Sequence, residues 1–129
     1  MKRAVVTSGA DTPNVVELSS GHTLTFDLGK AGGGEGRGPS STEGVSASLA
    51  ACTAGTLKIY ADRKGWDLDG LEVSVETTYD GPNPKLFEVS VGLPDRFDDD
   101  QIARLMRIAG KCPVHRLLAE ATEVTVSQT

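Results

Sequence analysis

The sequence predicts one α+β domain over residues 1–129, with antiparallel sheets around a long central helix. Short apolar runs broken by turn residues open the chain, and a capping box then begins the longest stretch of helical spacing. Two alternating runs joined by a Gly-Pro turn follow. With 129 residues and 38% hydrophobic content, the chain is large enough to bury a core without metals or several disulfides.

The first third of the chain is expected to form a three-stranded antiparallel meander. Its apolar runs are Ala4 to Val6, Val15 to Leu18 and Thr23 to Leu28, each separated by turn residues. A glycine-rich loop, Gly32 to Gly38, ends this pattern.

One long helix is predicted to follow the loop. Ser40 and Glu43 form an S-x-x-E capping box, and Gly65 provides the C-cap. Six residues recur at helical spacing between them: Val45, Leu49, Cys52, Thr56, Ile59 and Arg63. Cys52 therefore lies near the middle of the helix, which we expect to be packed on several sides.

A hairpin is predicted after the long helix. Leu71 to Tyr79 and Phe87 to Val91 both alternate apolar and polar side chains, as in strands with one wet face. Asp80 to Pro84 supplies the turn between them.

Two helices and a last strand complete the expected order. Asp98 caps the first helix, Gly110 ends it, and Pro113 suits the first position of the second. Val124 and Val126 then indicate a terminal strand.

Composition and motifs exclude several classes of function. The net charge of −5 is dispersed, so neither nucleic acid nor an anionic membrane is an expected partner. The glycine loop lacks the lysine of a P-loop, and Cys112-x-x-His115 offers too few ligands for structural zinc. The sequence contains no G-x-S-x-G motif, so a hydrolase of that type is not expected. The first residues lack the apolar core of a signal peptide, so a cytoplasmic location is expected. We also expect no bound cofactor and no metal.

The two cysteines are the residues most suited to chemistry. Cys112 lies beside a helix N-terminus and near Lys111, His115 and Arg116, which favours a thiolate. Cys52 lies in an apolar helix, where burial raises a thiol pKa. If both face one site, a sulfenic acid formed on one thiol can be closed to a disulfide by the other.

Two separated motifs resemble those of the OsmC/Ohr family. The first comprises Gly38-Pro39-Ser40, the run Leu49 to Ala54 and the run Tyr60 to Trp66; the second is Lys111 to Arg116. The resemblance implies an intertwined homodimer that reduces organic hydroperoxides. In that family the first cysteine, here Cys52, attacks the peroxide. The second, here Cys112, resolves the sulfenic acid, and an external dithiol of the lipoyl kind restores both thiols.

The chain departs from the best-studied branch of that family in the groups that activate the first cysteine. That branch uses an arginine from a loop of the opening strands and a glutamate ten residues before the cysteine, where this chain has Thr42. Glu43 is the candidate carboxylate, as in other branches, although its capping role accounts for it equally well. Arg37 and Arg3 are the candidate cations, and a solvated loop arginine is the competing interpretation of Arg37.

Two other functions remain open. An OsmC-like protein that has kept its cysteines can instead bind an apolar or sulfur-containing small molecule at the dimer interface. A structural protein with inert thiols is the third interpretation, and it predicts slow labelling of both cysteines.

Overall fold

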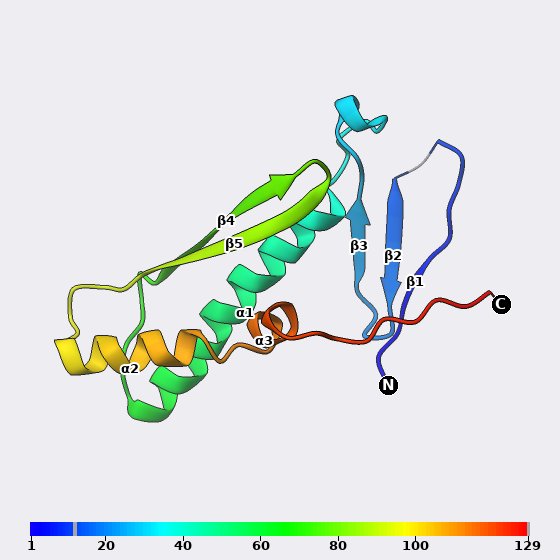
Figure 1. Cartoon of the computed structure of the whole chain (residues 1–129). Coiled ribbons are helices and arrows are strands. Elements are labelled where there is room, and N and C mark those ends of the chain that lie inside the picture. Colours follow the sequence, from blue (N-terminus) through cyan, green and yellow to red (C-terminus); the bar gives the residue numbers. More distant parts are fainter. Residues whose placement is uncertain (12, 129) are drawn as a thin grey trace. The chain divides into compact units, whose positions relative to one another are not determined.

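The computed structural model describes residues 1–11 and 13–128 and confirms the α+β class (Figure 1). Its contacts group the chain into two compact units, Met1–Val45 and Ser46–Thr129. A single domain over residues 1–129 stays a prediction.

The first unit contains the predicted meander. Strands β1 (Ala4–Val6), β2 (Asn14–Leu18) and β3 (Thr23–Phe26) pair antiparallel in the order β1-β2-β3. The third strand ends two residues before the predicted end at Leu28. Asp27 accounts for this, because its carboxylate accepts the backbone N–H of Leu28 and turns the chain out of the sheet. A 3₁₀ turn, η1 (Lys30–Gly32), follows in the glycine loop.

The long helix, α1 (Ser41–Lys64), begins at the predicted capping box. The Glu43 N–H donates to Ser40 Oγ at 3.2 Å, and the Ser40 N–H donates to Glu43 Oε1 at 3.0 Å. Gly44 lies against the ring of Phe26, and a Cβ at this position would collide with that ring. A glycine is therefore required where β3 and the first turn of α1 meet within the first unit.

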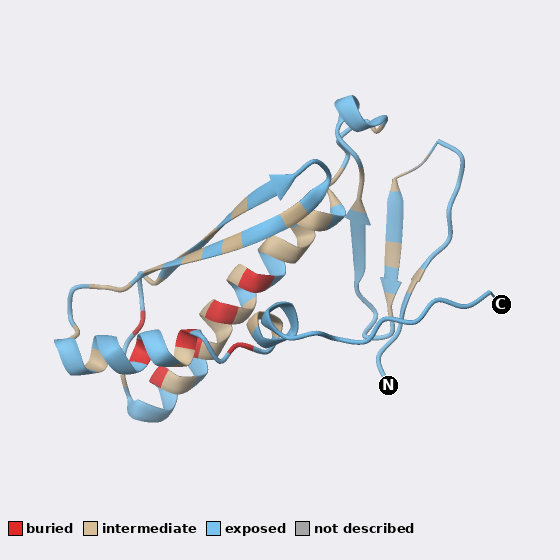
Figure 2. Ribbon diagram, viewed as in Figure 1, coloured by how far each residue is buried: buried red, intermediate tan, exposed pale blue. Residues whose placement is uncertain are grey.

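In the second unit, α1 buries a stripe that repeats every four residues, seen in red in Figure 2: Leu49, Thr53, Leu57 and Ala61. The residues whose spacing predicted the helix only partly share this face. Leu49 is buried and Cys52 is half-buried, whereas Ile59 is 58% exposed. The many small residues of α1 carry almost no amphipathic signal, so periodicity alone does not identify the buried face.

The predicted hairpin is present as β4 (Glu72–Asp80) and β5 (Asn83–Gly92). Its turn is shorter than expected, because Asn83 already pairs with Asp80 and only two residues connect the strands. Gly81, at φ +60°, supplies the left-handed conformation that such a turn requires. Ser46 of α1 and Thr77 of β4 share a hydrogen bond of 2.7 Å between their hydroxyls, which joins the hairpin to the helix.

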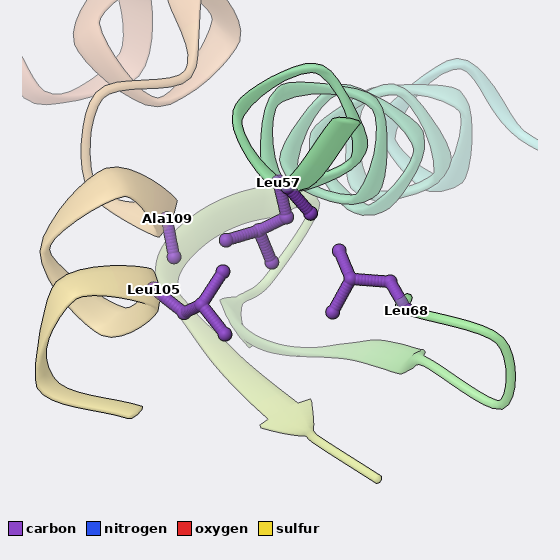
Figure 3. Close-up of a cluster of buried hydrophobic side chains, with 5 residues drawn as sticks. Leu57, Leu68, Leu105 and Ala109 are labelled. Carbon is purple, nitrogen blue, oxygen red and sulfur yellow. The ribbon is translucent and has the colours of Figure 1, made fainter. Parts of the chain in front are cut away.

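Helix α2 (Asp99–Ala109) begins at the predicted cap Asp98, which forms a capping box with Gln101 through two hydrogen bonds. Its buried side chains meet α1 and the loop before β4 in one cluster, most of which is labelled in Figure 3. The members are Leu57, Ala61, Leu68, Leu105 and Ala109. This cluster is the core of the second unit.

Helix α3 (Pro113–Ala119) has Pro113 at its first position, as predicted. The predicted terminal strand is wrong. Val124 and Val126 are 84% and 95% exposed, and residues 121–128 form no helix or strand. Alternation alone does not make a strand, because the backbone N–H and C=O groups need a neighbouring strand to pair with. Within residues 1–11 and 13–128, no helix combines the length and apolarity needed to span a bilayer.

Leu105→Ala should lower the free energy of unfolding by about 2–5 kcal/mol, because it leaves a cavity in the core of the second unit. The control is Leu117→Ala, a helical leucine that is 50% exposed, for which we expect a loss of about 1 kcal/mol or less. Denaturant titration at fixed protein concentration measures both values. Equal losses for the two variants would show that Leu105 does not lie in the core.

Candidate functional site

The second unit brings the two cysteines into contact. Cys52 lies on the middle of α1 and is half-buried, whereas Cys112 lies between α2 and α3 and is fully buried. Both are free thiols, and the Cys52 S–H donates a hydrogen bond to the Cys112 sulfur. Two sulfurs in contact from separate elements have the arrangement needed to form a disulfide with little movement.

Cys112 is the N-cap residue of α3, as its position before Pro113 predicts. Its backbone is extended, at φ −61° and ψ 137°, and its sulfur accepts the N–H of His115 at 3.3 Å. The backbone N–H of Val114 also donates to this sulfur. Sulfur thus takes the place that a serine or aspartate oxygen usually occupies at a helix start.

Thr53 belongs to the site, although the sequence did not identify it. Its side chain is 1% exposed, and its hydroxyl donates to the Leu49 carbonyl at 2.8 Å. The same hydroxyl also hydrogen-bonds to Cys112. One feature of the sequence could have identified Thr53. It lies four residues from both Leu49 and Leu57, so it is a polar side chain on the buried face of α1.

The two thiols have pKa values that move in opposite directions. Burial raises the pKa of Cys52 first, and its hydrogen bond to Cys112 raises it further; bonds from the Val114 N–H and Thr56 oppose these effects. Burial also raises the pKa of Cys112. The hydrogen bonds from Cys52, the His115 N–H, Thr53 and the Val114 N–H outweigh it, so this pKa lies below its ordinary value.

A groove of about 270 Å³ in the second unit adjoins the thiol site through Leu49 and His115. It is mainly apolar, with two basic side chains, and its lining comprises Leu49, Lys85, Phe87, Val89, His115, Leu118 and Ala119. His115 lines the groove and donates its backbone N–H to Cys112, and Leu49, which also lines the groove, accepts a hydrogen bond from Thr53. The groove therefore has the polarity for an apolar molecule close to the cysteine pair.

The other candidate residues, Glu43, Arg37 and Arg3, lie in the first unit. Glu43 is engaged in the capping box with Ser40. Arg37 donates from Nε to Asp27 at 3.1 Å and from a terminal nitrogen to the Asp11 carbonyl at 3.1 Å. The action of these residues on Cys52 stays a prediction.

Asp27 organises the glycine loop through four hydrogen bonds. It accepts the backbone N–H groups of Leu28, Glu35 and Arg37, as well as the Arg37 Nε–H. The backbone N–H of Arg37 is the largest influence on the pKa of Asp27, which lies below the ordinary value of 3.8. Arg37 therefore has a structural role in the first unit, which is independent of any action on Cys52.

Comparison with known proteins gives one family and several related structures. The family model described as OsmC-like protein matches residues 32–127. No curated protein matches the chain.

Three of the similar solved structures illustrate the likeness. An OsmC-like protein from Mycoplasma pneumoniae superposes with a TM-score of 0.78 at 16% identity, over 92% of this chain and 87% of that chain. An organic hydroperoxide resistance protein, OsmC, from Legionella pneumophila superposes with a TM-score of 0.65 at 20% identity, over 92% of this chain and 88% of that chain. The organic hydroperoxide resistance protein OhrB of Bacillus subtilis superposes with a TM-score of 0.55 at 19% identity, over 90% of this chain and 88% of that chain. At these identities the likeness shows the fold.

Asp27→Asn should lower the melting temperature at neutral pH, because the loop loses the carboxylate that accepts its N–H groups. Since the pKa of Asp27 is lower in the folded state, its stabilisation is fully present above the unfolded value of 3.8. It is lost as pH falls through the lower folded value. The difference between native protein and variant should therefore shrink in acid.

The control is Asp11→Asn, because Asp11 contacts Arg37 through its backbone carbonyl, which this substitution keeps. Thermal denaturation at a series of pH values measures all three proteins. A difference between native protein and Asp27→Asn that is the same at every pH would contradict the assignment.

Proposed function

This chain belongs to the OsmC-like family, and from that premise we propose that it reduces organic hydroperoxides with its two cysteines. The contact between Cys52 and Cys112 is the observation that supports this most directly. Cys52 attacks the peroxide and becomes a sulfenic acid, and Cys112 closes it to a disulfide. In total, two thiols and one hydroperoxide become one disulfide, one alcohol and one water.

Exposure supports this division of roles. Cys52 is half-buried, so a peroxide can approach its sulfur, whereas Cys112 is fully buried. Helix position favoured Cys112 as the more acidic thiol, and its lowered pKa agrees with that expectation. Acidity and accessibility therefore favour different cysteines. We assign the attack to Cys52 because a thiolate that the peroxide cannot reach cannot be the nucleophile.

The groove that adjoins the thiol site supports an apolar peroxide over hydrogen peroxide. Its lining is mainly aliphatic and aromatic, and it shares Leu49 and His115 with the site. Related structures in the comparison carry the description of organic hydroperoxide resistance proteins. We propose the same substrate class here, with an external dithiol of the lipoyl kind as reductant. A cytoplasmic homodimer, with Arg37 or Arg3 and Glu43 assisting Cys52, belongs to the same proposal.

Binding without catalysis is the second candidate function. The raised pKa of Cys52 favours it, because the neutral thiol is a poor nucleophile. The groove then serves as a site for an apolar or sulfur-containing small molecule.

Native protein supplied with a dithiol should consume an organic hydroperoxide in many turnovers. Cys52→Ser should abolish turnover, since it removes the attacking sulfur. Cys112→Ser should oxidise once per chain and then stop or cycle poorly. Peroxide consumption and mass spectrometry of the oxidised protein measure these outcomes.

Native protein treated with one equivalent of peroxide should contain a disulfide between Cys52 and Cys112, and Thr122→Ala, outside the thiol site, serves as the control for substitution itself. Turnover no faster than that of the free dithiol would reject the reductase. Saturable binding of an apolar hydroperoxide analogue by such an inactive protein would support the second candidate.

A further inference from the structure

We propose that Cys112 is the resting thiolate of the pair and the proton acceptor for Cys52, with Thr53 as the positioning residue that holds this charge. The inference rests on the proposed function and deepens it. It assigns Cys112 a task before it resolves the sulfenic acid. It also assigns a task to Thr53, which follows Cys52 in the first motif.

Hydrogen-bonding groups surround the Cys112 sulfur. Two are backbone N–H groups, from Val114 and from His115, the latter at 3.3 Å. Two are side chains of α1, the thiol of Cys52 and the hydroxyl of Thr53. These groups around one fully buried sulfur, with the Thr53 hydroxyl turned toward it, stabilise a negative charge there, and a neutral thiol gains less from them.

The Thr53 hydroxyl can respond to that charge because it has one hydrogen and two acceptors within reach. It donates to the Leu49 carbonyl at 2.8 Å, and it also contacts the Cys112 sulfur. In an α-helix the Leu49 carbonyl also accepts the backbone N–H of Thr53, so it keeps a partner if the hydroxyl turns away. The reorientation toward a thiolate therefore leaves no buried carbonyl unpaired.

Cys52 lacks such a shell. Its sulfur accepts from the Val114 N–H and Thr56, and it donates its own proton to Cys112. Among the described residues, Lys85 on β5 and His115 on α3 line the adjoining groove, and Lys111 and Arg116 are close to Cys112 in the sequence. In the resting pair the negative charge thus lies on Cys112, and the proton stays on Cys52.

The reaction then needs one proton to move back and forth. Cys52 passes its proton to the Cys112 thiolate and attacks the outer oxygen of the hydroperoxide, so an S–O bond forms as the O–O bond breaks. The departing alkoxide takes the proton from Cys112 and leaves as the alcohol, which restores the Cys112 thiolate beside a Cys52 sulfenic acid. That thiolate attacks the Cys52 sulfur and releases hydroxide, which gives the disulfide.

The first arm of the test titrates thiolate in the fully reduced protein by its ultraviolet absorbance, without peroxide. We expect a midpoint below the ordinary 9.0 that persists in Cys52→Ser and disappears in Cys112→Ser. Thr53→Val, which keeps the shape and removes the hydroxyl, should raise the midpoint by about one unit. Thr53→Ser should restore the low value.

The proposal would be overturned if the low thiolate midpoint disappeared in Cys52→Ser and persisted in Cys112→Ser. Equal midpoints for Thr53→Val and Thr53→Ser would overturn it as well. Thermal denaturation of each variant shows whether it is folded. If Thr53→Val does not fold, the comparison of the two cysteine variants still decides where the thiolate lies.

The second arm measures a single oxidation of Cys52 by an organic hydroperoxide as a function of pH. In Cys112→Ser the rate at neutral pH should fall about tenfold and recover at alkaline pH, where Cys52 ionises without help. If Cys112→Ser is oxidised at the native rate at neutral pH, Cys112 is not the proton acceptor, although the protein can still be a reductase. Absence of any oxidation in the native protein would reject the reductase itself, and the titration would still report the location of the thiolate.

Discussion

The structure of the second unit depends on one buried face of α1, along which Leu49, Thr53, Leu57 and Ala61 repeat every four residues. Leu57 and Ala61 pack with side chains of α2 and the loop before β4, which produces the core. One turn earlier on the same face, Thr53 meets the Cys112 sulfur, and Cys52 lies beside it. Core and site are therefore continuous, so packing that fixes the rotation of α1 also aligns the two sulfurs.

Cys112 combines a structural and a chemical role in one side chain. As the N-cap of α3 it satisfies an N–H that would otherwise lack a partner. The same contact places donors around its sulfur and lowers its pKa despite complete burial. The hydrogen bonds that begin α3 thus also favour a thiolate at Cys112. We nevertheless assign the attack on the peroxide to Cys52, because Cys52 is the more accessible of the two thiols.

The first unit shows a similar combination of roles at Asp27. One carboxylate ends β3, accepts N–H groups across the glycine loop and pairs with Arg37. A loop rich in glycine has a large conformational entropy to lose, and several bonds to a single acceptor offset part of that loss. Arg37, selected from the sequence as a candidate cation, therefore also serves the order of its own loop.

Local signals in the sequence determined where most elements begin and end. The capping boxes at Ser40 and Asp98, Pro113, and the alternation on either side of Gly81 each act within a few residues, so they can be recognised without a structure. The two cysteine motifs also indicated the family and both thiols. Only the tertiary structure decided which face of α1 is buried, that Thr53 joins the site, and that the two cysteines lie close together. It also decided that Val124 and Val126 form no strand within the chain. These features depend on partners distant in sequence, because burial, hydrogen bonding to a remote sulfur and strand pairing have no local signature.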